Sequence, residues 1–119
     1  IPETVDGLSL YDTILHDTEI ERSYLHGEHS FHSGFSNHYI VTPTDKYIWY
    51  SETGREQYFH LANDPNETHD ALHDVQYQQR IEQLRKYLIA ELKDREEGYS
   101  DGSRLFSGKC AKTILQQKY

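Results

Sequence analysis

The sequence predicts an α+β fold: a small antiparallel sheet of about four strands, with one long amphipathic helix packed across it. β-rich runs separated by turn residues fill positions 21–61. Apolar residues then recur at helical spacing between Tyr77 and Leu92. Because an apolar sheet face needs a cover and no other segment is amphipathic and long enough, this helix is expected to pack on the sheet.

The predicted strands cover residues 22–29, 38–42, 46–50 and 56–61. Residues 31–37, rich in Ser, Gly and Asn, form a loop, and Pro43 lies in the turn of a hairpin. Gly54 is the candidate for positive φ in the next turn. Gly27 indicates a bulge or a close approach to the backbone within the first strand.

Pro65 ends the sheet, since proline cannot donate to a strand ladder. Thr68 is expected to cap a short helix through Leu72, and a long helix follows over about 75–96. Its apolar stripe comprises Tyr77, Ile81, Leu84, Leu88 and Leu92. On the solvent side, i,i+4 ion pairs are expected for Glu82 with Lys86 and for Glu91 with Arg95.

The 119 residues fit a single domain, 1–119. It divides into an approach segment (1–20), the sheet (21–61), helices (68–97) and a tail (98–119). In the approach segment, Leu10 and Ile14 suit one short helix that begins near Ser9. In the tail, Leu105 and Phe106 suit a short edge strand.

Composition excludes several classes of function. The formal net charge of −8 argues against a nucleic-acid partner, and no apolar run is long enough to span a membrane. A single cysteine, Cys110, cannot form an internal disulfide. The mean hydropathy of −0.87 is polar. Without a methionine, a chain that begins at Ile1 is expected to be a fragment or a processed product.

The main candidate site is His26, Glu28 and His29, with His32 and His38 nearby. On a strand His26 and Glu28 face one way and His29 the other, so no metal site is expected. Two interpretations stay open. The side chains are ordinary surface or half-buried residues, or they line a polar pocket where Gly27 lets a ligand approach the backbone.

Two further patterns have ordinary explanations. The aromatic residues of the strands favour a sheet core over a carbohydrate or base-stacking platform; they are Tyr39, Tyr47, Trp49, Tyr50, Tyr58 and Phe59. Asn66-Glu67-Thr68 matches the N-glycosylation pattern, which matters only in a eukaryotic secretory setting.

Four segments in order resemble the C-terminal part of formylglycine-dependent sulfatases of the alkaline phosphatase superfamily. They are Asp6 to Leu10 (DGLSL), Arg22 to His29 (RSYLHGEH), Thr44 to Tyr50 (TDKYIWY) and Glu56 to Glu67 (EQYFHLANDPNE). His60 stands where the family commonly has Asp. The resemblance extends from about Val5 to Leu105 and implies a subdomain of an enzyme that hydrolyses sulfate esters.

The resemblance also implies that the reactive groups lie outside this chain, in an N-terminal catalytic domain of the same polypeptide. That domain is expected to carry the formylglycine nucleophile and calcium. Cys110, followed by Ala111 and Lys112, does not match the formylglycine motif, and no run of aspartates resembles the calcium ligands. We therefore expect no catalytic residue, cofactor or metal in this fragment, which should be inactive alone.

By resemblance, His26, Glu28 and His29 lie near the substrate cleft and are expected to contact the sulfated substrate, such as a sulfated sugar. The alternatives are the C-terminal part of a related phosphonate or phosphodiester hydrolase, and an independent carbohydrate-binding module. For a bacterial protein the family implies a periplasmic or secreted location.

Overall fold

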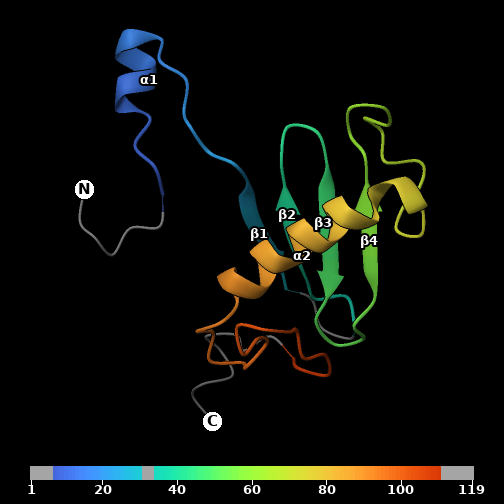
Figure 1. The fold of residues 1–119 in the computed structure, drawn as a ribbon. Coiled ribbons are helices and arrows are strands. Elements are labelled where there is room, and N and C mark those ends of the chain that lie inside the picture. Colours follow the sequence, from blue (N-terminus) through green and yellow to red (C-terminus); the bar gives the residue numbers. More distant parts are fainter. Residues whose placement is uncertain (1–6, 31–33, 111–119) are drawn as a thin grey trace.

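Four strands form one antiparallel sheet in the order β1-β2-β3-β4, and helix α2 crosses one face of it (Figure 1). The computed structural model describes residues 7–30 and 34–110. Its elements are α1 (Tyr11–His16), β1 (Leu25–His29), β2 (Asn37–Val41), β3 (Lys46–Tyr50), β4 (Glu56–Phe59), the 3-10 helix η1 (Val75–Tyr77) and α2 (Gln78–Glu91). The predicted α+β fold is confirmed.

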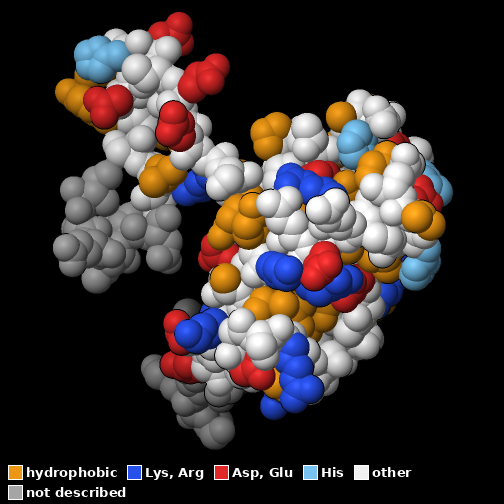
Figure 2. Space-filling view, viewed as in Figure 1, with side chains coloured by type: hydrophobic (Ala, Val, Ile, Leu, Met, Phe, Trp, Pro, Cys, Tyr) orange, Lys and Arg blue, Asp and Glu red, His pale blue; other side chains and the backbone are white. Residues whose placement is uncertain are grey.

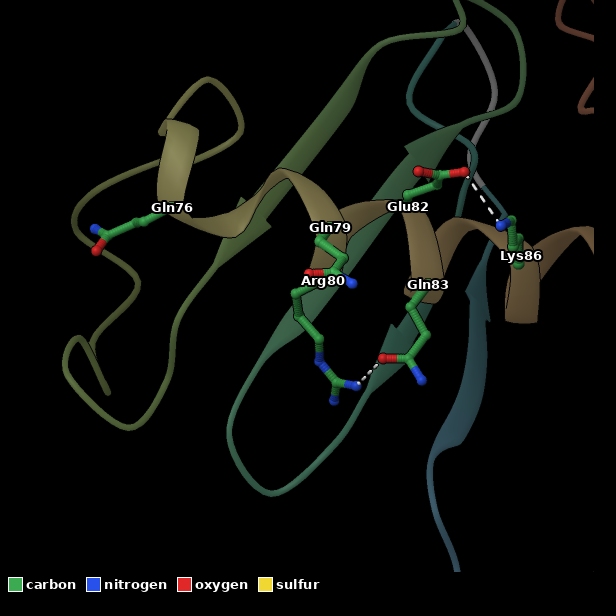
Figure 3. Close-up of a pocket in the computed structure, with 6 residues that line it drawn as sticks. All are labelled: Gln76, Gln79, Arg80, Glu82, Gln83 and Lys86. Atoms are coloured by element: carbon green, nitrogen blue, oxygen red, sulfur yellow. Dashed lines mark hydrogen bonds and ion pairs between the residues drawn. The ribbon is translucent and has the colours of Figure 1, made fainter.

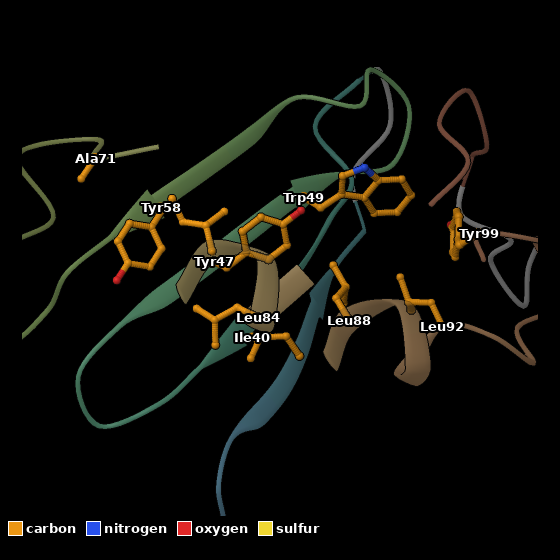
Figure 4. Close-up of a cluster of buried hydrophobic side chains, with 10 residues drawn as sticks. Ile40, Tyr47, Trp49, Tyr58, Ala71, Leu84, Leu88, Leu92 and Tyr99 are labelled. Atoms are coloured by element: carbon orange, nitrogen blue, oxygen red, sulfur yellow. The ribbon is translucent and has the colours of Figure 1, made fainter. Parts of the chain in front are cut away.

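The β2–β3 hairpin places two sets of side chains on opposite faces of the sheet. His38 pairs with Trp49, and Ile40 with Tyr47, and all four side chains are buried. Ile40, Tyr47 and Trp49 lie on the side of α2 (Figure 4). Their neighbours along each strand are only half-buried on the other face. This alternation follows from the two-residue period of a strand.

The core lies between α2 and the sheet (Figure 4). Four of the five predicted stripe residues of the helix are at most 1% exposed: Ile81, Leu84, Leu88 and Leu92. They pack with Ile40, Tyr47, Trp49, Tyr58, Ala71 and Tyr99. Removing such a side chain from water is worth about 1.5–3 kcal/mol, so this stripe fixes the helix on the sheet.

The helix predicted from Thr68 to Leu72 is wrong, since turns replace it in the structure. Both carboxylate oxygens of Asp64 are used there, one by the Thr68 hydroxyl and one by the backbone N–H of His69. The backbone N–H of Ala71 then donates to the Tyr58 carbonyl at 2.8 Å. This segment therefore lies along the outer edge of β4 and cannot form its own helical bonds.

The long helix is shorter than the predicted 75–96. It begins as η1 and α2 ends at Glu91, after which Lys93 and Arg95 make three-residue turn bonds to Ala90 and Leu92. Such bonds tighten the end of a helix. Gly98 has φ +73° and marks the point where the chain turns back toward the sheet.

The N-terminal arm, residues 7–20, stands apart from the sheet in Figure 1. Helix α1 has no buried residue, and the hydroxyl oxygen of Ser9 accepts the backbone N–H of Tyr11 at its start. Six apolar or aromatic side chains of the arm are 38–77% exposed: Leu8, Leu10, Tyr11, Ile14, Leu15 and Ile20. The arm therefore presents apolar surface that the described residues do not cover.

The segment after α2 closes one end of the core. Tyr99 is fully buried and packs edge-on against His38 and Trp49, with ring centroids 4.9 and 5.8 Å apart. The predicted edge strand at Leu105 is reduced to one bridge with Ser100. The tail from residue 111 lies outside the described residues.

Candidate functional site

The predicted site residues lie on β1, an edge strand of the sheet. His26 and Glu28 share the face toward α2, opposite Ile40 and His38 of β2. His29 is one residue from Glu28 and three residues from His26, so it belongs to the other face by the alternation of a strand. The structure therefore brings His26 and Glu28 together and separates His29 from them. His32 lies outside the described residues.

Gly27 sits in regular register opposite Tyr39, so the strand has no bulge there. The ring of Tyr39 lies directly against it, in the space that a Cβ atom at this position would need. The close approach predicted for Gly27 is therefore made by a tyrosine side chain of the neighbouring strand.

His38 joins the candidate residues from the neighbouring strand. Its Nδ1 is 3.4 Å from Nε2 of His26 and 3.6 Å from a carboxylate oxygen of Glu28. The two imidazole rings are stacked, with centroids 5.6 Å apart. His38 is only 3% exposed. The sequence predicts His38 only as a neighbour of the candidate site, because its contacts with His26 and Glu28 depend on the register of β1 with β2.

Arg95 is held between two carboxylates just beyond the end of α2. Its guanidinium is 2.8 Å from Glu28 and 3.4 Å from Glu97. The i,i+4 pair predicted between Glu91 and Arg95 is therefore wrong, whereas Glu82 and Lys86 form theirs at 3.1 Å. The tight turn after α2 directs Arg95 toward β1, and its ion pair with Glu28 links this edge strand to the end of the helix.

Glu91 instead accepts a hydrogen bond from the hydroxyl of Tyr24, at 2.7 Å. The ring of Tyr24 stacks on Tyr87 of α2, with centroids 4.6 Å apart and planes 15° apart. Burial is the main cause that raises the pKa of Tyr24 to about 12, and the hydrogen bond to Glu91 acts in the same direction. Tyr24 thus stays a neutral hydroxyl donor at physiological pH.

Together these side chains border a hollow of about 680 Å³, here called the β1–α2 pocket. Its lining comprises Glu21, Arg22, Ser23, Tyr24, His26, Glu91 and Arg95. Glu28 and His38 adjoin the lining residues, Glu28 through its ion pair with Arg95 and His38 through its contact with His26. The pocket is rich in hydroxyl, carboxylate and guanidinium groups and can offer both donors and acceptors.

The histidines next to the pocket are neutral at physiological pH. Burial lowers the pKa of His26, against the opposing effect of Glu91 and Glu28. Burial also lowers the pKa of His38 to about 4, and His26 and Arg95 act in the same direction. A neutral imidazole has one donor and one acceptor nitrogen, so His26 can serve a ligand in either role.

A second hollow, of about 560 Å³, lies on the outer face of the long helix (Figure 3). Its side chains mostly bond one another, as with Arg80 to Gln83 and Glu82 to Lys86. In Figure 2 basic and acidic side chains lie close together on the face of the molecule that carries α2. This hollow is the solvated side of an amphipathic helix, so the β1–α2 pocket is the stronger candidate.

The described residues contain no group of three or more His, Cys, Asp or Glu side chains that could hold a metal ion. Within the same residues, no helix combines the length and the apolar character that crossing a membrane requires.

Comparison with known proteins shows what kind of protein this α+β unit resembles. The chain is 50% identical over 114 residues to an arylsulfatase from Clostridium perfringens (strain 13 / Type A). The match covers 96% of the chain and 24% of the arylsulfatase, so the chain spans about a quarter of the length of this relative. No protein-family model matches the chain.

Solved structures share the fold. One, a complex with its substrate D-glucosamine-2-N,6-O-disulfate, superposes with a TM-score of 0.71 at 17% identity, over 81% of this chain and 22% of the other. Another, a 2-O GAG sulfatase, gives 0.69 at 20% identity, over 90% of this chain and 24% of the other. The predicted resemblance to a part of the sulfatases is confirmed.

Proposed function

We propose that the chain is the C-terminal subdomain of a sulfatase that hydrolyses sulfate esters, and that it is inactive alone. The observation that carries this proposal is the 50% identity over 114 residues to an arylsulfatase four times as long as the matched segment. Identity at that level over nearly the whole chain supports a shared role within a larger enzyme.

The nucleophile and the metal are assigned to the catalytic domain. The described residues do not fit a calcium ion, since no suitable group of ligands occurs among them. Cys110 is exposed, and the residues that follow it do not match the formylglycine motif. By the resemblance to the sulfatases, the formylglycine and the calcium ion are proposed to lie in an N-terminal domain of the same polypeptide.

The partner surface is the apolar arm together with the sheet face opposite α2. The arm exposes Ile14 by 77% and Leu15 by 56%. The sheet face opposite α2 carries Tyr39, Ile48 and Tyr50, which are only half-buried. Apolar surface of this kind is typical of an interface, and the catalytic domain is the proposed occupant.

Within this enzyme, His26 and Glu28 are the proposed contacts to a sulfated substrate such as a sulfated sugar. His26 lines the β1–α2 pocket directly, and Glu28 fixes Arg95 in its wall. His29, on the other face of β1, stays a prediction and would have to meet substrate from a different side.

The test is a comparison of the full-length polypeptide with residues 1–119 alone. The full-length protein should release sulfate from 4-nitrophenyl sulfate, and the fragment should not. Faster hydrolysis of bis(4-nitrophenyl) phosphate than of the sulfate ester would favour a phosphodiester hydrolase. In the full-length protein, His26→Ala and Glu28→Ala should lower kcat/KM for a sulfated substrate, while the exposed control His69→Ala should not.

A further inference from the structure

The charges of the β1–α2 pocket limit which part of a sulfated substrate it can hold. Arg95 is compensated by Glu28 and Glu97, so its charge is largely neutralised within the protein. Apart from Arg95, the charged residues that line the pocket are one cation, Arg22, and two carboxylates, Glu21 and Glu91. A sulfate group placed here would lie beside like charges, which is unfavourable at short range.

The same groups suit hydroxyls. One carboxylate oxygen of Glu91 accepts the Tyr24 hydroxyl at 2.7 Å, and an ionised carboxylate has further lone pairs to accept from a ligand. Tyr24 keeps its hydroxyl in place because its ring is stacked on Tyr87. Ser23 and His26 add neutral polar groups to the same wall.

We propose that the β1–α2 pocket binds hydroxyl groups of the substrate's sugar ring through Glu91 and Tyr24, and that the sulfate group lies outside it. This inference rests on the proposed sulfatase function and specifies the chemical class that the pocket takes: a neutral, hydroxyl-bearing glycosyl unit. Glu91 is the acceptor, and Tyr24 fixes the orientation of its carboxylate.

The test uses two sulfate esters with the full-length protein: glucose 6-sulfate, which has ring hydroxyls, and 4-nitrophenyl sulfate, which has none. Glu91→Ala should lower kcat/KM for glucose 6-sulfate roughly tenfold, the loss expected for a charged hydrogen bond, and leave 4-nitrophenyl sulfate unchanged. Tyr24→Phe should show the same split with a smaller loss. Glu82→Ala, the matched control on the outer face of α2, should change neither.

An equal loss on both esters would mean that Glu91 only supports the structure, and no loss on either would mean that the pocket is not used. Both results overturn the inference. A smaller loss for glucose 6-sulfate than for the aryl ester would also overturn it. If the wild-type protein hydrolyses neither ester, the proposed function fails, and binding of methyl glucoside is then measured by saturation-transfer NMR. Binding that Glu91→Ala weakens supports the pocket inference without the enzyme, and equal or absent binding overturns it.

Discussion

Arg80 of α2 forms a two-point ion pair with Asp45 in the β2–β3 turn. Its Nε lies 2.7 Å from one carboxylate oxygen and its Nη2 lies 3.0 Å from the other. Asp45 is 3% exposed. Burial acts to raise the pKa of this carboxyl, but hydrogen bonds from Arg80 and Thr42 outweigh burial and hold the pKa below its usual range.

Arg80→Ala should therefore lower the free energy of unfolding by about 3 kcal/mol, because it leaves the charge of Asp45 buried without its partner. Arg80→Lys should recover only part of this loss, since an ammonium group cannot make the two-point contact. Urea unfolding curves measure both values. A loss below about 0.5 kcal/mol for Arg80→Ala would show that solvent replaces the arginine.

Gly27→Ala should destabilise the protein by about 1–3 kcal/mol through overpacking. The added methyl group would occupy the space that the Tyr39 ring fills, and the strand backbone gives it no other direction. In the double variant with Tyr39→Ala, the cost of the methyl group should nearly vanish. Additive losses in this double-mutant cycle would contradict the packing explanation.

Acid should destabilise the fold through His38. The histidine has a folded pKa of about 4 and an unfolded pKa of about 6.5, so its neutral form contributes fully above pH 6.5. As pH falls from 6.5 to 4, the unfolded chain binds the proton first and stability drops, by about 3 kcal/mol at most. The charged or titratable groups that influence His38 are His26, Glu28, Arg95 and Glu97.

Urea unfolding at several pH values between 7.5 and 4 measures this dependence. In His38→Gln, most of the dependence of the unfolding free energy on pH should disappear, although this variant is less stable at pH 7. His69→Gln is the matched control, because the His69 side chain is exposed and its Nε2 lies 3.2 Å from a carboxylate oxygen of Asp74. A slope that is unchanged in His38→Gln would assign the acid sensitivity to other groups.

The exposed arm should make the isolated chain associate with itself. Ile14 is 77% exposed and Leu10 54%, so residues 1–119 are expected to form oligomers at concentrations where the full-length protein is monomeric. Light scattering on Ile14→Asp with Leu10→Asp should show less association. Unchanged scattering would exclude the arm as the interacting surface.

The sequence allowed the sheet and the buried helix stripe to be predicted because both depend on local periodicity. Burial determines both patterns directly: apolar residues alternate with a period of two in β2 and β3, and they recur at helical spacing at Ile81, Leu84 and Leu88. The prediction of a helix from Thr68 was wrong because Asp64 and the edge of β4 accept the backbone N–H groups of His69 and Ala71, which a helix would have used. No local pattern shows such competition.

The candidate site was predictable only in part for a similar reason. His26 and Glu28 share a face by strand alternation, which the sequence shows. Their partners His38, Arg95 and Glu91 depend on strand register and on where α2 ends. Those are tertiary features, so the pocket could be seen only in the fold.

The most direct test of the account is sulfate release by the full-length polypeptide beside residues 1–119, with 4-nitrophenyl sulfate as substrate. We expect turnover by the full-length protein and none by the fragment at equal concentration. Turnover by purified residues 1–119 would contradict the assignment of this chain as a dependent subdomain.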